Sequence, residues 1–434
     1  MSTSAPPELF PAARLNRDCF CVGADLPALT AWLRQDLAQR GYDWHIVETH
    51  PHLFSELAVF VSSRHLAKMQ SLVAAVESVV ANPAYVAAAL AQAPPVARHE
   101  PAQRGVFFGY DFHTGEDEPD ARRDPQLIEI NTNAGGALLN VELERAQRAC
   151  CDAVRHLLAG PGHVDRTEEE FVAMFREEWR LARGDAGPGR IAIVDDEPPG
   201  QYMYPEFLLF ARLFETHGMP TAIADAAALE WDGTSLRHEG RRIDLVYNRL
   251  TDFYLEEPRH AALRAAYLAG AVVLTPHPRA HALYADKRNL ALLTDAARLR
   301  QWGVSEGVID TLQAGIPATR IVRPADAESL WAGRKQLFFK PACGFGSRGS
   351  YRGDKLTRKT FAAILQGNYV AQVLVPPGIR VTREEGVPRT LKLDLRNYVY
   401  DGKVQLVAAR LYQGQATNFR TAGGGFAPVF HPPA

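Results

Sequence analysis

The sequence predicts an α/β protein with a mainly helical N-terminal part, a small open α/β sheet and a C-terminal part built on long antiparallel strands. Apolar residues recur at helix spacing between residues 62 and 82. An apolar strand, an amphipathic helix and a second apolar strand follow one another between residues 190 and 225. Two long segments flank Asp401-Gly402, a dipeptide typical of a tight hairpin turn.

Composition excludes several classes of protein. The chain has 434 residues, of which 47% are hydrophobic and 23% charged, enough to build two or three packed domains. Its net charge of -2 gives no general attraction to nucleic acid or to an anionic membrane. The start lacks a signal-peptide pattern, no long apolar run exists, and the five cysteines form no CxxC pair. We therefore expect a cytoplasmic protein with reduced thiols and with neither nucleic-acid nor membrane partners; the sequence leaves its oligomeric state open.

The first predicted region, residues 1–185, is mainly helical. Ser62 or Ser63 can cap its clearest helix, and Asn82-Pro83 ends that helix. Two short strands, GVFFGYDFH and PQLIEIN, follow within residues 105–136 and are joined by an acidic turn. A helix through the Cys150 region then leads to a second amphipathic helix.

The second predicted region, residues 186–275, is the small open α/β sheet. It opens with the strand RIAIVDD, continues with a helix closed by Gly218, and then forms the strand PTAIAD. A hairpin turning at Asp232-Gly233 leads to a further strand that ends near Arg249.

The third predicted region, residues 276–434, contains a possible phosphate-binding loop. Lys340 ends an apolar run, and the following loop contains Gly344, Gly346, Ser347 and Gly349. Glycines let backbone N–H groups approach phosphate oxygens, while a lysine supplies a positive charge. The loop is not a Walker A motif, because no GK[ST] closes it.

Two further segments of this region suggest ligand contacts. The strand NYVAQVLVPPG runs into Pro376-Pro377, which stops strand pairing and frees main-chain groups that can hold a flat base such as adenine. Beyond it, strand alternation places Lys392, Asp394 and Arg396 on one face, with Arg410 on the returning strand.

A third polar pair lies early in the chain. In LIEINTNAGG the period of two places Glu129 and Asn131 on one face of the strand. A carboxylate beside an amide oxygen is half of a site for a hard cation.

Taken together, FFKPACGFGSRG, YVAQVLVPPG, LDLRNYVYDG, ARLYQGQATNFRTAGGG and IEINTNAGG resemble successive blocks of the ATP-grasp superfamily. The E-x-N strand usually follows the GGG block in that family, whereas here it appears near residue 130. The chain therefore resembles circularly permuted ATP-grasp proteins that are similar to the glutathionylspermidine synthetases. The resemblance implies an ATP-grasp fold with a circularly permuted strand order, a pre-ATP-grasp α/β domain and an N-terminal helical region.

The resemblance also implies roles for individual residues. Asp111, Glu129 and Asn131 would bind Mg²⁺, and Lys287 and Lys340 would contact the phosphates of ATP. The glycine loop from Gly344 to Gly349 would close over the phosphates. The adenine would be held by four consecutive residues, Gln372, Val373, Leu374 and Val375.

The implied activity is that of an ADP-forming carboxylate–amine ligase, with small-molecule acid and amine substrates of the amino acid, short peptide or polyamine class. Arg396 and Arg410 would grip the carboxylate and the acyl phosphate, and Asn418 with the backbone of residues 423–425 would bind the oxyanion. One departure is that Gly109 occupies the position where the glutathionylspermidine synthetases carry an arginine. We therefore expect different substrates.

Several alternatives stay open. The same frame can serve a kinase that phosphorylates a hydroxyl group, or a protein that binds ATP without turning it over. Arg249 can contact the substrate or form a structural ion pair beside Asp252. No helix can be assumed across Pro278, so His277 and His281 are not expected to bind a metal together. Cys343 is expected to fill space in the glycine loop, with oxidation as the alternative.

Overall fold

The computed structural model describes residues 12–20, 22–39, 49–115, 124–147, 163–344, 346, 348–384 and 386–431. Three features predicted from the sequence lie outside these residues: Ser347 of the glycine loop, the acidic turn at 116–118 and the helix through Cys150.

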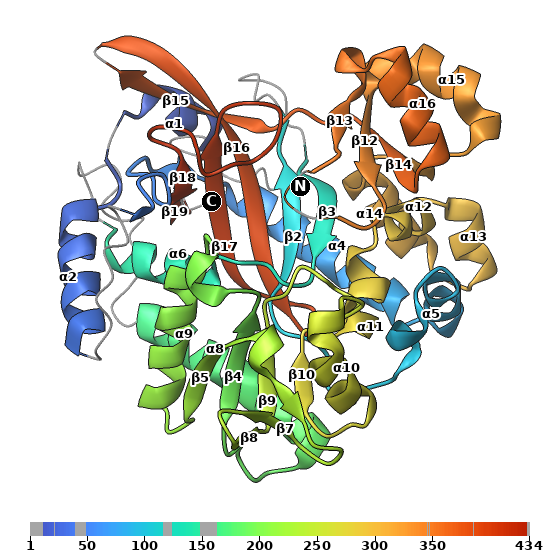
Figure 1. The fold of residues 1–434 in the computed structure, drawn as a ribbon. Helices are drawn as coiled ribbons and strands as arrows, with labels where there is room; N and C mark the ends of the chain where they lie inside the picture. Colours follow the sequence, from blue (N-terminus) through green and yellow to red (C-terminus); the bar gives the residue numbers. More distant parts are fainter. Residues whose placement is uncertain are drawn as a thin grey trace, which may run out of the picture.

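A central antiparallel sheet joins strands from the two halves of the chain (Figure 1). Its strands, in spatial order, are β18 (Gly425–Ala427), β17 (Lys403–Tyr412), β16 (Val387–Tyr400), β2 (Phe108–His113) and β3 (Gln126–Asn131), and β15 (Gly378–Glu384) also pairs with β16. The two early strands therefore extend the sheet of the long C-terminal hairpin, because β2 pairs with β16 and β3 pairs with β2. Asp401 and Gly402 both adopt positive φ at the hairpin turn, as expected for this dipeptide.

A parallel sheet lies below the central sheet in the view of Figure 1. Its strand order is β10 (Val273–Thr275), β9 (Leu245–Asn248), β4 (Ile191–Asp195) and β5 (Thr221–Asp225). Helix α9 (Tyr204–Thr216) connects β4 to β5, and Gly218 follows it at φ +75° as the predicted stop. The hairpin strands β6 (Glu230–Trp231), β7 (Leu236–His238) and β8 (Arg241–Ile243) form a small separate sheet.

A third, antiparallel sheet lies at the upper right of Figure 1. It contains β11 (Thr319–Ile321), β14 (Tyr369–Val373), β12 (Leu337–Pro341) and β13 (Tyr351–Arg352). Leu330, Phe339 and Phe361 are buried in its own small core, with α15 (Ala327–Gly333) and α16 (Arg358–Gln366) alongside. A short parallel pair, β1 (Val59–Phe60) with β19 (Val429–Phe430), ties the early part of the chain to its last strand.

Helices cover the sheets. The other α-helices among the described residues are α1 (Ala12–Asp18), α2 (Leu26–Gln39), α4 (Ser63–Val80), α5 (Pro83–Leu90), α6 (Ala137–Arg145), α8 (His163–Arg183), α10 (Ala261–Leu268), α11 (Pro278–Ala280), α12 (Arg288–Leu293), α13 (Ala296–Gln301) and α14 (Glu306–Gly315). The backbone N–H of His65 donates to the Ser62 hydroxyl at 3.2 Å, so Ser62 is the N-cap of α4, and Asn82 caps α5 with Pro83 in its first turn.

Aromatic packing fixes the parallel sheet against the central one. Phe107, which directly precedes β2, is fully buried, and its ring lies 4.8 Å from Phe171 of α8, 6.1 Å from Tyr247 of β9 and 6.3 Å from Tyr398 of β16. The contacts with Phe171 and Tyr398 are edge-to-face, a geometry that adds about 0.5–1.5 kcal/mol each beyond the burial of apolar area. The strand that carries Asp111 is therefore held by contacts from both sheets.

None of the described helices is by itself long and apolar enough to cross a membrane. Helices α4 and α5 together reach that length and composition, but they are bent by 80° relative to each other.

Candidate active site

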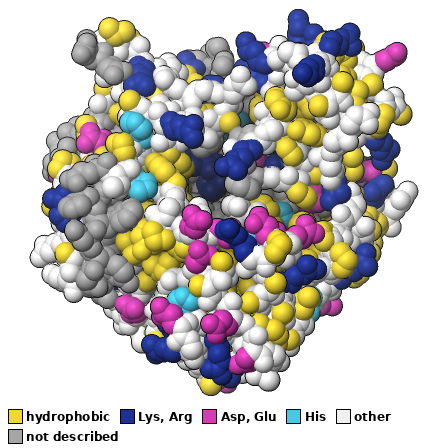
Figure 2. Space-filling model, in the orientation of Figure 1, with side chains coloured by type: hydrophobic (Ala, Val, Ile, Leu, Met, Phe, Trp, Pro, Cys, Tyr) yellow, Lys and Arg dark blue, Asp and Glu magenta, His cyan; other side chains and the backbone are white. Residues whose placement is uncertain are grey.

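One cavity of 620 Å³ lies between the central sheet and the β11–β14 sheet. Its walls bring together most of the residues predicted from the sequence: Asp111, Glu129, Asn131, Lys340, Gly346, Gln372, Val373, Leu374, Val375, Arg396 and Arg410. A smaller cavity between Glu129, Lys287 and the glycines at 344 and 346 continues from it. Figure 2 shows the molecule hollowed in the middle of this face, with Lys and Arg side chains in the hollow and acidic side chains along its edge.

The register of the central sheet places three charged residues in a row. Asp111 of β2 lies directly opposite Glu129 of β3 on one side and Arg396 of β16 on the other. Directly opposite residues of antiparallel strands point to the same face, so all three side chains face the cavity. Asn131 donates its amide to Asp111 Oδ2 at 3.0 Å.

Two arginines hold the Asp111 carboxylate. Arg396 donates through Nε to Oδ1 at 2.6 Å and through Nη2 to Oδ2 at 2.7 Å, and Arg410 Nη2 lies 3.1 Å from Oδ2. Burial alone would raise the pKa of Asp111, but the two guanidinium groups outweigh it and lower the pKa to about 2. The Asp111 carboxylate is therefore ionised, and both of its oxygens are in contact with guanidinium groups.

Arg410 is also fixed from its other side. Its Nε donates to Asp394 Oδ1 at 2.6 Å, and the Thr417 hydroxyl donates to Asp394 Oδ2. Asp394 is buried on β16, whereas Thr417 comes from the loop after β17 and lines the cavity. Strand alternation placed Asp394 on the right face, but no pattern in the sequence pointed to Thr417.

Two lysines lie where nucleotide phosphates were expected. Lys340 Nζ donates to the Ile128 carbonyl at 2.7 Å and to Gln372 Oε1 at 3.0 Å, and burial lowers its pKa to about 8. Lys287 Nζ donates to the Gly344 carbonyl at 3.1 Å and lies 3.9 Å from Glu129 Oε2. Burial would raise the pKa of Glu129, but these two lysines hold it below its usual value.

The expected adenine segment is partly engaged within the sheet. The Gln372 amide also donates to the Thr319 hydroxyl at 3.2 Å, and the backbone N–H groups of Val373 and Leu374 donate to the carbonyls of Ala318 and Gln336, which directly precede β11 and β12. The N–H groups of these two residues are therefore not free, contrary to the expectation for this segment.

His113 lines the same cavity and was missed from the sequence. Its Nδ1 lies 2.8 Å from the Val375 carbonyl, a contact in which the ring nitrogen must donate, and burial lowers the pKa of the ring. The position two residues after Asp111 on one strand was the signal that could have identified it.

Two glycines in the described part of the glycine loop have left-handed backbone conformations. Gly346 and Gly349 have φ of +59° and +69°, values that only glycine adopts freely. A Cβ on Gly349 would lie 3.2 Å from both Pro341 Cγ and the Tyr369 hydroxyl. Cys343 is exposed, so it does not act as the space filler expected from the sequence. Desolvation of its thiol and the neighbouring Asp286 carboxylate, 3.6 Å away, raise the pKa of the thiol to about 11, which argues against a reactive thiolate.

Two expected oxyanion contacts lie elsewhere. Asn418 donates to the Gln413 and Ala416 carbonyls at 2.6 and 3.1 Å and accepts from the Arg420 backbone, so its amide organises its own loop. The glycines at 423–425 are not among the residues lining the cavity; a Cβ on Gly425 would lie 2.6 Å from the His52 carbonyl.

Three other residues have structural contacts. Arg249 is buried with Nη1 3.1 Å from the Tyr247 hydroxyl and Nη2 3.7 Å from Glu206, and its expected partner Asp252 instead bonds His260. A short helix begins at Pro278, where His277 caps it and proline is tolerated in the first turn. His281 stacks on Phe253 at 3.9 Å, so the two histidines have separate partners.

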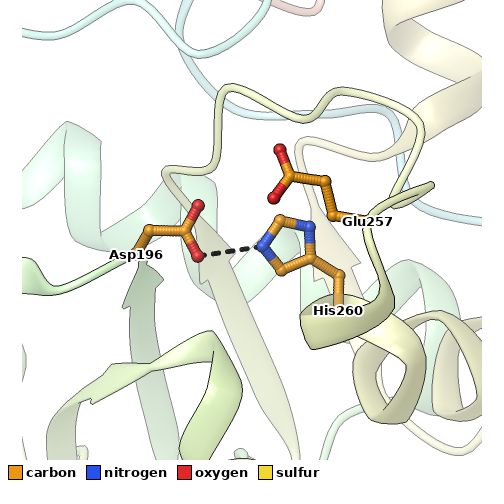
Figure 3. A group of neighbouring side chains, drawn as sticks. All are labelled: Asp196, Glu257 and His260. Atoms are coloured by element: carbon orange, nitrogen blue, oxygen red, sulfur yellow. Dashed lines mark hydrogen bonds and ion pairs between the residues drawn. The ribbon is translucent and has the colours of Figure 1, made fainter.

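A second charged cluster lies at the carboxyl edge of the parallel sheet. Asp196, Glu257 and His260 have ligand atoms within 4.8 Å of one another, a grouping that can hold a metal (Figure 3). His260 is fully buried, with Nε2 2.9 Å from Asp196 Oδ1 and Nδ1 2.8 Å from Asp252 Oδ2. Because both ring nitrogens are bonded to carboxylates, the ring joins the loops that follow β4 and β9.

The contacts of His260 with Asp196 and Asp252 predict that the free energy of unfolding depends on pH. Burial would lower the pKa of His260, but its bonds to Asp252 and Asp196 raise it above the usual value. The bonds of protonated His260 to the two carboxylates therefore stabilise the fold fully below about pH 6.5, the ordinary pKa of histidine. This stabilisation is lost as the pH rises through the higher pKa of His260 in the folded protein. We expect His260→Gln to lower the free energy of unfolding by about 1–3 kcal/mol at pH 6 and by less at pH 9. Urea unfolding at both pH values measures this, and an equal loss at the two pH values would contradict it.

Comparison with known proteins identifies the fold. No protein-family model matches the sequence, and no curated protein matches it. A glutathione synthetase-like effector from Globodera pallida, in its apo form, superposes with a TM-score of 0.55 at 10% identity, covering 94% of this chain and 98% of the effector.

Two further solved structures are less similar and match smaller parts of the chain. A putative gamma-glutamylcysteine synthetase from Methylobacillus flagellatus gives a TM-score of 0.47 at 10% identity, over 83% of this chain and 85% of that one. The ATP-grasp ligase PsnB in complex with minimal precursor, Mg and ADP gives 0.29 at 16% identity, over 54% and 74%. The match to the effector extends over nearly the whole of both chains, and from it we conclude that this protein shares the fold of that glutathione synthetase-like effector; the mixed helix-and-sheet fold class expected from the sequence is thereby confirmed.

Proposed function

We propose that this protein is an ATP-dependent, ADP-forming ligase that joins a carboxylic acid to an amine through an acyl phosphate. The observation that carries the proposal is that one cavity contains the buried Lys340, a hard-cation ligand pair and two oriented arginines, while the buried Lys287 lines the smaller cavity that shares Glu129 with it. These are the groups that phosphoryl transfer to a carboxylate requires, because charge neutralisation and positioning dominate its catalysis.

ATP would lie with its base against the apolar residues from Val373 to Val375 and with its phosphates toward Lys340 and Lys287. Val373 is 43% exposed and, with Leu374, presents an apolar wall that a base can cover. Closure of the glycine loop over the phosphates would exclude water that otherwise hydrolyses an acyl phosphate.

The donor set fits Mg²⁺ at Glu129 and Asn131. The Glu129 side chain is 28% exposed, and the carboxylate of Glu129 and the amide oxygen of Asn131 are hard ligands on one face of β3. When bound, the metal would neutralise phosphate charge. Asp111 stands in the same row, but guanidinium groups occupy its oxygens, so it fits a ligand role less well.

The two arginines would hold the reacting acid. Each guanidinium has five N–H donors, and the bonds to Asp111 and Asp394 leave other donors on both groups. The substrate carboxylate oxygen attacks the γ-phosphorus and ADP leaves; the amine nitrogen then attacks the acyl carbon, phosphate leaves and the nitrogen loses a proton. The arginines would stabilise the charge that develops in both steps.

The strand order supports a circularly permuted chain as part of the proposal. The strands with Asp111 and Glu129 come early in the sequence yet lie beside the C-terminal hairpin. The substrates remain small acids and amines, and Gly109 supports a class different from that of the glutathionylspermidine synthetases.

Trapping of the intermediate tests the proposal. With ATP, Mg²⁺ and a panel of carboxylic acids, hydroxylamine should convert the acyl phosphate to a hydroxamate, detected by colour with Fe³⁺ and by mass. A phosphorylated alcohol formed without hydroxamate would favour the kinase. Absence of ATP binding in calorimetry would contradict both activities.

A further inference from the structure

We propose that Asp111 is a positioning residue that orients Arg396 and Arg410 and that it does not bind the metal. The inference rests on the proposed function and deepens it. It assigns the polar residues of the central sheet that face the cavity to two groups, one that binds the metal and one that orients the arginines. The first group is Glu129 with Asn131, and the second is Asp111 with the two arginines.

The contacts of the two carboxylates differ. Asp111 is 1% exposed, and four donor contacts converge on it, two from Arg396, one from Arg410 and one from Asn131. A carboxylate offers about four lone-pair sites, so these contacts satisfy it. Glu129 is more exposed, and the contacts described for it are longer, with Lys287 Nζ at 3.9 Å and Asn131 Nδ2 at 3.5 Å.

A metal on Asp111 would be electrostatically costly. It would have to displace guanidinium contacts of 2.6–3.1 Å and would leave buried arginine charges without their partner. The divalent charge would then stand beside those guanidinium groups in a site of low dielectric.

Gly109 gives an independent reason for the arrangement. A Cβ on Gly109 would lie 3.1 Å from Arg396 Nε and 2.6 Å from the Ala134 Cβ. The Arg396 side chain therefore crosses β2 at the one place in that strand where no side chain stands, two residues before Asp111 on the same face. Beyond Gly109 the Arg396 guanidinium donates two hydrogen bonds to Asp111. These bonds fix the orientation of the guanidinium plane toward the cavity.

NMR of the arginine Nε–H groups in the wild-type protein tests the assignment directly. Signals of Arg396 and Arg410 are identified by their loss in Arg396→Lys and Arg410→Lys. We expect the Arg396 signal to keep its carboxylate-bonded shift when Mg²⁺ and ADP bind, and to lose it in Asp111→Asn. Loss of that shift on adding Mg²⁺ and ADP, or no change of it in Asp111→Asn, would overturn the proposal.

Metal affinity gives a second test with a matched ligand variant. Mn²⁺ binding in the presence of ADP is measured by EPR for the wild type, Asp111→Asn and Glu129→Gln, with circular dichroism to verify folding. We expect Glu129→Gln to weaken Mn²⁺ binding at least about 10-fold more than Asp111→Asn does. Equal weakening by the two variants would make Asp111 a ligand and overturn the proposal.

Failure of the proposed function has a different signature. If the wild-type protein binds neither ADP nor Mn²⁺, the ligase proposal and this one both fall. If the wild type binds both and only the Arg396 signal responds to the metal, the Asp111 assignment alone is wrong.

Discussion

Glu129→Ala is expected to lower ATP turnover by about 10³-fold or more, because a lost metal ligand removes several kcal/mol of charge stabilisation in the transition state. The fold should survive, since the Glu129 side chain is 28% exposed and faces the cavity. Steady-state ADP release and thermal unfolding measure the two effects. The expected pattern is a large loss of rate with a change of a few degrees in Tm.

The matched control for this variant is Glu215→Ala, which removes an exposed carboxylate from α9. It should leave turnover unchanged. If Glu129→Ala retained wild-type turnover at saturating Mg²⁺, the metal role of this strand would be refuted.

The second large effect is expected for Arg410→Lys. Arg410 uses Nε for Asp394 and Nη2 for Asp111, at 2.6 and 3.1 Å. One ammonium group cannot reproduce this fork, so the charge is kept while the geometry is lost. We expect kcat/KM to fall by about 10²–10³-fold, the scale for loss of one oriented donor at a developing anion.

Arg320→Lys is the control for the arginine chemistry, because Arg320 is exposed on β11. Its kinetics should match the wild type. Wild-type kinetics in Arg410→Lys as well would remove Arg410 from the site. Recovery of activity after a second change at Asp394 would instead indicate that the first variant failed because the carboxylate was left unpaired.

Local patterns predicted much of the fold. Cap and turn residues such as Ser62, Gly218 and the Asp401-Gly402 pair act within a few residues of chain, so they could be identified without the tertiary structure. Alternation in β16 placed Asp394 and Arg396 on one face for the same reason. The short helix at Pro278 was not assumed from the sequence, although its cap, His277, and its first-turn proline are both local features.

The contacts within the site could not be predicted in this way. Asp111 lies 285 residues from Arg396 in the sequence, and only the register of β2 against β16 sets them opposite each other. Asn418 donates to carbonyls of its own loop, and Thr417 contacts Asp394. Both contacts depend on loop geometry, and a loop has no periodic sequence pattern from which they could be predicted. Residue types therefore suggested the chemistry, but the tertiary pairing decided which groups hold one another.

The most direct test of the central claim is ADP and phosphate release from ATP and Mg²⁺ over a matrix of carboxylic acids and amines, with mass detection of products and Glu129→Ala as the control. The ligase account predicts that wild-type ADP release requires both an acid and an amine and yields a product whose mass equals their sum less one water. ADP release with a hydroxyl compound alone, accompanied by its phosphorylated product, would contradict it.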